Sequence, residues 1–357
     1  MAVETGRQPL KAEPTEQGPG GARALGSAAW TLLKRFLTLR EGSVIVITII
    51  TIVYFSVTLD KFATSDNFKT LLPYFAPVAI LAAGEVFLMI NGEIDLSIGA
   101  VYLFAPFIFS KIYDGGIPLI PSLILALVCC MVVGLINGLF TAVVGINSFI
   151  TTLGMLLSLE GLTLIISHAQ PVDTPGTNVV GGLTTFARTF GGGTYSELIW
   201  ALAIITVLQI VLTLTRWGLY TVAVGGNRLG AAEAGVKVKL VIIRNFILCS
   251  TCAAFVGVLE AVRTSSVQPD PSGANEVLFD GISAAVIGGT LLAGGSGTVV
   301  GALIGALFLG VLRDGLIIKG VNADYLSFYL GLAIIVAMAA NTYVGRVRRR
   351  SGVAGAR

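Results

Sequence analysis

Residues 216–239 read RWGLYTVAVGGNRLGAAEAGVKVK and form a polar segment between two long apolar runs. Asn227 can cap the start of a helix, and Gly235 can end it in a left-handed conformation. The Ala-rich residues between them predict a helix of about two turns, whereas a bilayer span needs about 20 apolar residues. This helix must therefore lie at the membrane surface, and four basic residues place it on the cytoplasmic side: Arg216, Arg228, Lys237 and Lys239. It suits a docking element for a soluble partner, although an ordinary basic loop is the simpler alternative.

The whole chain has the composition of a membrane protein. Its mean hydropathy is +0.87, with 55% hydrophobic and 12% charged residues, whereas about a quarter of the residues in soluble domains are charged. Repeated apolar runs predict an all-α protein that crosses the membrane several times. The length of 357 residues leaves room for one integral domain and no sizeable soluble one.

About ten transmembrane helices are expected, some of them short or broken. The candidate spans are 43–59, 71–90, 95–113, 118–143, 147–167, 197–215, 240–262, 281–292, 298–318 and 325–342. The run 281–292 is too short to cross alone, so it predicts a half-helix or one extended by its glycine-rich neighbours. An even number of spans puts both termini on one side. Most of the 23 Lys and Arg residues lie in the two terminal segments and around residues 216–244, which places these parts in the cytoplasm.

Three parts of the chain follow from this topology. Residues 1–40 are expected to form a disordered or amphipathic cytoplasmic tail, 41–343 the transmembrane domain, and 344–357 a basic cytoplasmic tail. The segments 168–196 and 263–280 are then external loops that could meet a soluble partner or a substrate.

Residues 91–99 read NGEIDLSIG and bring two carboxylates, Glu93 and Asp95, between two apolar runs. An ionisable group at membrane depth is costly and usually faces protein or a cavity. A tight cytoplasmic turn is the simpler reading, and we expect Asp95 to cap the next helix through its backbone amides. The role of Glu93 stays open.

Glycines are dense late in the chain. Gly297, Gly301 and Gly305 recur every four residues, which aligns small residues on one helix face and permits close helix crossing. Gly134 and Gly138 repeat the pattern. Packing is the favoured interpretation, and a role in lining a pore is the alternative. Since broken or short segments often mark transport paths, 281–297 is a candidate gate.

Five polar residues lie within or at the ends of apolar runs: Glu85, Asn137, Glu160, Gln209 and Glu260. A hydroxyl-rich substrate needs convergent donors and acceptors, so we take Glu85, Asn137 and Glu160 as candidates for a translocation path. Each could equally make a hydrogen bond between helices.

Several kinds of chemistry are not expected. Four cysteines fall inside apolar runs, and Cys249 and Cys252 have no second ligand pair. His168 is the only histidine, so no catalytic set and no histidine-based metal site is expected. The chain has no phosphate-binding GxxxxGK[ST] motif, hence no ATP cofactor of its own. No basic patch with interleaved aromatics suggests nucleic acid.

Four motifs in order resemble the permease subunits of ATP-binding-cassette (ABC) importers for ribose and other monosaccharides. Residues 92–99 (GEIDLSIG) are close to the GGIDLSVG of that family, with Glu93, Asp95 and Ser97 in the motif turn. Gly225-Gly226-Asn227 through Gly235-Val236, Gln268-Pro269, and the run 280–297 (DGISAAVIGGTLLAGGSG) follow. The resemblance covers about residues 43–342 and leaves only the tails outside.

The resemblance implies a set of partners. Two permease chains, identical or paralogous, would form the translocation path, an ABC ATPase subunit would use ATP in the cytoplasm, and an extracytoplasmic binding protein would deliver the sugar at the bacterial inner membrane. It also implies that the short surface helix is the coupling helix on which the ATPase docks. Its residues are Asn227, Arg228, Leu229, Gly230, Ala231, Ala232, Glu233, Ala234 and Gly235.

Three departures from the family pattern stand out. Glu93 stands where a glycine is common, the stretch Gln268–Asp280 is slightly longer than usual, and Arg228-Leu229-Gly230 stands where an acidic, Ala-rich start is typical. A monosaccharide or polyol of the ribose or xylose type is the leading substrate. A nucleoside, an autoinducer-type furanose or a branched-chain amino acid is the alternative. A membrane-embedded enzyme and an ion channel are the other classes, and the sequence shows neither a catalytic constellation nor a filter motif.

Overall fold

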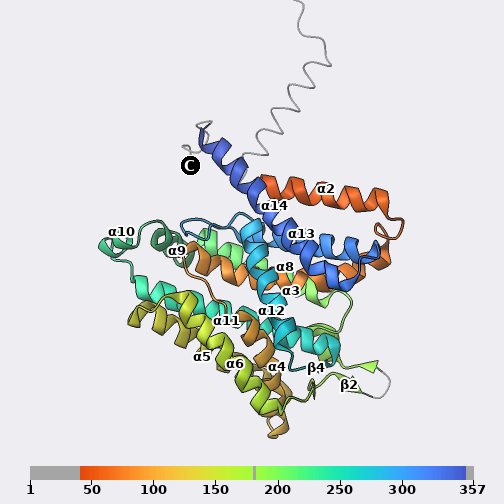
Figure 1. Ribbon diagram of the computed structural model, residues 1–357. Coiled ribbons are helices and arrows are strands. Elements are labelled where there is room, and N and C mark those ends of the chain that lie inside the picture. The colour runs from red at the N-terminus through yellow and green to blue at the C-terminus, as the bar shows by residue number, and fades with distance from the viewer. Residues whose placement is uncertain (1–40, 180–181, 351–357) are drawn as a thin grey trace, which may run out of the picture. The chain divides into compact units, whose positions relative to one another are not determined.

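Helix α11 (Val238–Thr264) is the longest span and runs through the fold between α3 (Ser65–Ile90), α4 (Ile98–Asp114) and α5 (Leu119–Leu139) (Figure 1). The computed structural model describes residues 41–179 and 182–350. The other helices are α2 (Gly42–Thr58), η1 (Phe140–Val144), α6 (Ser148–Ser167), α7 (Thr185–Phe190), α8 (Ser196–Leu214), α9 (Arg216–Gly226), α10 (Arg228–Glu233), α12 (Pro271–Ile287), α13 (Val299–Ile318) and α14 (Ala323–Arg350).

Each of the ten predicted spans overlaps a helix, which confirms an all-α protein with many membrane helices. Among the described residues, six helices are long and apolar enough to cross a membrane: α3, α5 with its continuation η1, α6, α8, α11 and α13. Helix α2 and residues 323–339 of α14 are shorter apolar helices. Helices α4 and α12 have 17 residues each, or about 25 Å, which is less than the roughly 30 Å of a hydrocarbon core.

The predicted boundaries of the 281–292 run are wrong. The helix there, α12, begins at Pro271 and ends at Ile287. Asp270 starts it, because its Oδ1 accepts a hydrogen bond from the backbone N–H of Ser272 at 2.9 Å, and proline is tolerated in the first turn. The predicted loop 263–280 therefore shrinks to the residues between α11 and α12.

The tails are described only in part. Residues 344–350 of the predicted C-terminal tail continue helix α14. The remainder of that tail and the predicted tail 1–40 lie outside the described residues, so these parts of the domain prediction stay predictions.

Helices cross closely where glycine leaves room. A Cβ added at Gly134 would lie 2.6 Å from the carbonyl oxygen of Phe246, so α5 touches the backbone of α11. Helix α13 also lies close to the end of α12. A Cβ added at Gly301 would lie 2.1 Å from the carbonyl oxygen of Gly288, and a Cβ added at Gly305 would lie 2.1 Å from the carbonyl oxygen of Ala284. The predicted place of Gly297 on the same helix face as Gly301 and Gly305 is wrong, because α13 begins at Val299 and Gly297 lies in the loop before it, where an added Cβ would be 2.8 Å from the Thr290 side chain. These close crossings depend on the missing side chains.

Four short strands in the described part of the chain make two antiparallel pairs. Strand β1 (Val172–Asp173) pairs with β4 (Ser266–Val267), and β2 (Asn178–Val179) pairs with β3 (Gly182–Leu183). The first pair joins the two loops that the sequence places outside, so both loops lie at the same end of α11. The segment α9–α10 precedes the other end of α11, and Figure 1 shows α10 and β4 on opposite sides of the view.

Candidate functional site

A polar turn at residues 91–97 joins α3 to α4 at the α10 end of the molecule. The chain reverses at Gly92, whose φ of +73° is in the left-handed region that glycine adopts without strain. Helix α6 holds the far side of the turn: Leu96 N–H donates to Thr152 Oγ1 at 3.0 Å, and Ile94 N–H donates to Ser148 Oγ at 3.4 Å. The 91–97 turn is thus fixed by side chains from a helix far away in sequence.

A buried carboxylate cluster lies directly behind the turn. It consists of Glu85, Asp95, Ser97 and Asn137, all with 0% exposure. Asp95 N–H donates to Glu85 Oε1 at 3.2 Å, and Asp95 Oδ1 accepts from the Ser97 hydroxyl at 2.6 Å. Asn137 Nδ2 donates to Ser97 Oγ at 2.9 Å. Since buried polar groups need partners, these bonds tie α3, the turn and α5 together.

Asp95 does not cap α4 as predicted. Its Oδ1 accepts from the backbone N–H of Ser97 at 2.8 Å, whereas α4 begins at Ile98 and Ser97 makes no side-chain cap bond. The Asp-x-Ser spacing lets the carboxylate bond to the chain two residues later, which closes a local turn before the helix starts. Asp95 therefore shapes the turn and carries its carboxylate into the protein.

Helices α9 and α11 bind the same turn through amide side chains. Asn91 Nδ2 donates to the carbonyl oxygen of Thr221 in α9 at 2.7 Å, and Asn245 Nδ2 of α11 donates to Asn91 Oδ1 at 2.6 Å. Asn245 in turn accepts from Trp217 Nε1 at 2.7 Å. The start of the segment that leads to α10 is therefore hydrogen-bonded to α11 and to the 91–97 turn.

Helix α10 has the start and end that the sequence predicted. Asn227 Oδ1 accepts from Gly230 N–H at 2.9 Å. At the other end Gly235 has φ +83°, and the N–H groups of Gly235 and Val236 bond to Ala232 and Ala231 carbonyls at 2.9 and 3.0 Å. This is the Schellman arrangement, which satisfies the last carbonyls of a helix.

The two faces of α10 differ. Ala231 is buried against the chain, whereas the Leu229 side chain is 71% exposed. Arg228 is half-exposed and reaches back to the turn, where its Nη2 donates to the Asn91 carbonyl oxygen at 2.7 Å and pairs with the Glu93 carboxylate. An exposed leucine on a capped surface helix is a suitable contact for a protein partner.

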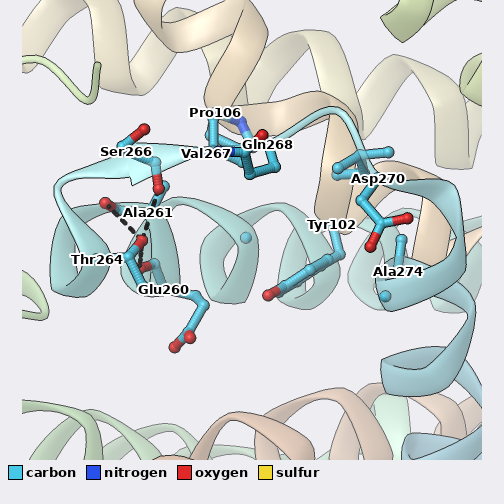
Figure 2. Close-up of a pocket in the computed structure, with 13 residues that line it drawn as sticks. Tyr102, Pro106, Glu260, Ala261, Thr264, Ser266, Val267, Gln268, Asp270 and Ala274 are labelled. Carbon is cyan, nitrogen blue, oxygen red and sulfur yellow. Dashed lines mark hydrogen bonds between the residues drawn. The ribbon is translucent and has the colours of Figure 1, made fainter. Parts of the chain in front are cut away.

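A cavity of about 260 Å³ lies at the opposite end of α11, between α4, α11 and the start of α12 (Figure 2). The α11 residues from Gly257 to Thr264 form one wall, and Tyr102 of α4 forms another. Its polar lining residues are Tyr102, Glu260, Thr264, Ser266, Gln268 and Asp270. Figure 2 shows the Tyr102 side chain extending away from Asp270, with its hydroxyl on the side where Glu260 lies. We call this the cavity end of the molecule.

Two polar side chains of the cavity, Tyr102 and Gln268, are available to a ligand. Neither the Tyr102 hydroxyl nor the Gln268 side-chain amide hydrogen-bonds to another described residue. Glu260 is paired with Arg263, which also lies 3.3 Å from Glu197 Oε1. Among the described residues that line the cavity, none is Lys or Arg. Its volume is just below the range of about 300–1,000 Å³ for drug-sized ligands, so a smaller ligand fits it.

Only two of the three predicted path residues lie in the same cluster. Glu85 and Asn137 meet in the buried carboxylate cluster, while Glu160 hydrogen-bonds to Asn275 of α12 at 2.9 Å. Their role in transport stays a prediction. Gln209 caps another helix, accepting from the N–H groups of Val299 and Val300.

Sequence reasoning named Asn91 only as the first residue of the 91–99 motif and missed its partner Asn245, whose only signal is an asparagine within an apolar run. It also missed the cavity, because Tyr102 reads as an ordinary aromatic residue of a span.

Comparison with known proteins agrees with the motifs. A family model described as "Branched-chain amino acid transport system / permease component" matches residues 67–338. The xylose/arabinose import permease protein XylH of Sulfolobus acidocaldarius is 36% identical over 86% of this chain and 86% of its own length. The ribose import permease protein RbsC of Escherichia coli K12 is 31% identical over 85% of this chain and 95% of its own length. The D-allose transport system permease protein AlsC of the same organism is 28% identical over 86% of this chain and 93% of its own length.

No solved structure matches the chain. The family model and the relatives both cover most of the region that carries the motifs. The protein therefore belongs to this family of membrane permease components and is the permease subunit of an ABC importer, similar to the sugar import permeases.

Proposed function

We propose that this permease subunit carries a monosaccharide, of the pentose or hexose type, across the bacterial inner membrane. The observation that carries the substrate class is the set of relatives, whose names specify xylose and arabinose, ribose, and allose. The cavity end supports it, because a neutral polyhydroxyl ligand needs hydroxyl, amide and carboxylate partners, and the lining supplies all three. The carboxylate of an amino acid would need a cation, and Lys and Arg are missing from the described lining.

The remaining parts of the machine are other chains. We propose that two copies of this chain, or this chain and a paralogue, enclose the path. An ABC ATPase supplies the energy in the cytoplasm and a binding protein delivers the sugar on the other side. In this arrangement both termini and α10 face the cytoplasm. The cavity end and the paired strands β1 and β4 face the outside of the cell. Glu85, Asn137 and Glu160 are candidates for residues along the translocation path.

The substrate test is uptake into proteoliposomes. The permease is reconstituted with its ATPase and binding protein, and ATP-dependent uptake of labelled xylose, ribose and allose is compared with uptake of leucine. We expect at least one sugar to be accumulated and leucine to be excluded. Accumulation of leucine in place of every sugar would contradict the proposed substrate class.

The docking test uses the exposed face of α10. Leu229→Asp removes an apolar contact of about 1.5–3 kcal/mol from an ATPase interface, so we expect the ATPase to co-purify at least ten-fold less. Lys239→Ala is the matched control, because Lys239 is exposed in the same region but lies outside α10. Equal co-purification of the Leu229 variant and the control would show that the ATPase docks elsewhere.

A further inference from the structure

The Arg228 side chain connects α10 to the 91–97 turn. Its Nη2 donates to the carbonyl oxygen of Asn91 at 2.7 Å and pairs with the carboxylate of Glu93. The Glu93 side chain is 9% exposed, so the pair is closed to solvent on the Glu93 side. A pair with one desolvated partner is screened less than a surface pair, so it can hold its geometry while the helix moves.

Arg228 and Glu93 carry opposite charges. The structure brings the two residues into contact although they are 135 residues apart in the sequence. Each residue therefore provides the charged partner of the other.

The 91–97 turn is hydrogen-bonded to three helices around it. Its Asn91 bonds to Thr221 of α9, and its Leu96 bonds to Thr152 of α6. Its Asp95 is bonded to Glu85 of α3. A displacement of α10 that pulls on Arg228 thus acts on a segment that is already hydrogen-bonded to α9 and to the membrane helices α3 and α6.

We propose that Arg228 is a positioning residue that, through Glu93 and the Asn91 carbonyl, fixes the coupling helix to the 91–97 turn and transmits its movement to the buried carboxylate cluster. The inference rests on the proposed docking of an ATPase on α10. The link between the two segments, however, is a property of this chain alone and can be measured without a partner.

The first experiment measures amide hydrogen exchange of the full chain in detergent. Glu93→Gln should raise exchange in residues 228–233, and Arg228→Ala should raise it in residues 91–97, each by about three-fold or more. Because Arg228→Ala removes both bonds of the link, adding Glu93→Gln to it should raise exchange no further than in Arg228→Ala alone. Lys237→Ala, which removes an exposed charge from the same region, is the control and should change neither segment. Additive effects, or exchange that rises only around the substituted residue, would overturn the link.

The second experiment measures transmission in the reconstituted importer. We expect the number of sugar molecules taken up per ATP hydrolysed to fall about two- to ten-fold in Arg228→Ala and to fall also in Glu93→Gln, with no further fall when Glu93→Gln is added to Arg228→Ala. Arg228→Lys keeps the positive charge but lacks the planar guanidinium group. Its ratio of sugar to ATP should therefore lie between those of Arg228→Ala and the unmodified chain. An unchanged ratio in Glu93→Gln would overturn the transmission role. If the unmodified importer moves no sugar, the proposed function fails instead, and the exchange experiment still decides the link.

Discussion

The two ends of α11 handle polar groups in opposite ways. At the α10 end, Asn91, Asn245 and Asp95 bond to other protein groups, and the cluster is closed to solvent, although Glu85 Oε2, Asp95 Oδ2 and Asn137 Oδ1 have no hydrogen-bond partner among the described residues. At the cavity end, the side-chain polar atoms of Tyr102 and Gln268 have no described protein partner and lie beside a cavity of about 260 Å³. Closed networks fix the relative positions of helices, whereas open groups bind ligands. The α10 end is therefore suited to transmit force, and the cavity end to contact the sugar.

The largest effect should come from the packing of the α10 end. A Cβ at Gly225 would lie 1.8 Å from the carbonyl oxygen of Ile90, which itself accepts from Gly295 N–H at 2.8 Å. Since backbone and not a flexible side chain fills the space, Gly225→Ala should lower the free energy of unfolding by about 3 kcal/mol. Thermal unfolding in detergent, followed by Trp fluorescence, measures this.

Gly226→Ala is the matched control for that substitution. Nothing lies within 4 Å of a Cβ added at Gly226. Its melting temperature should stay at or slightly above that of the unmodified chain, since alanine in place of a helical glycine stabilises by up to about 1 kcal/mol. If both variants melt together, the α10 end is not closely packed and the comparison between the ends loses its basis.

The second effect should come from the buried carboxylate cluster. Asp95→Ala leaves the Ser97 backbone N–H and hydroxyl without their acceptor, and burial makes that loss cost about 2 kcal/mol. Asp95→Asn keeps an acceptor oxygen of the same shape and should cost less than half as much. Both are measured by the same unfolding experiment. A fully stable Asp95→Ala variant would show that the turn is not held by this carboxylate.

The sequence predicted the elements at both ends better than their contacts. Asn227 and Gly235 act through their own backbone neighbours, so the short helix could be read directly from the chain. The pairing of Glu93 with Arg228 depends on how α3, α4 and α9 cross, and no local pattern contains that information. The cap assigned to Asp95 was wrong because two short-range hydrogen bonds, to the next helix or within the turn, fit the same spacing. The start of α12 was missed because polar residues on its first turns resemble a loop.

The smallest effect should come from the cavity end, where a substitution removes a ligand contact without disturbing the fold. Gln268 is exposed and its side chain bonds to no described residue, so Gln268→Ala should leave the melting temperature unchanged. Loss of one hydrogen bond to a sugar costs about 1 kcal/mol, which corresponds to a roughly five-fold higher KM for uptake. Tyr102→Phe keeps the ring and removes only the hydroxyl, so it should give a similar rise.

The control for the cavity end is Ser327→Ala, because Ser327 lines a neighbouring surface hollow, which shares Asp270 and Gly273 with the cavity, but does not itself line the cavity. It should leave KM at the unmodified value. The readout is ATP-dependent sugar uptake at saturating binding protein, so that delivery is not limiting. Raised KM with unchanged stability in Gln268→Ala and Tyr102→Phe would mark the cavity as a place where the sugar is bound. Unchanged KM in both variants, beside a normal control, would mean that the open polar groups face solvent and that the sugar passes elsewhere along the chain.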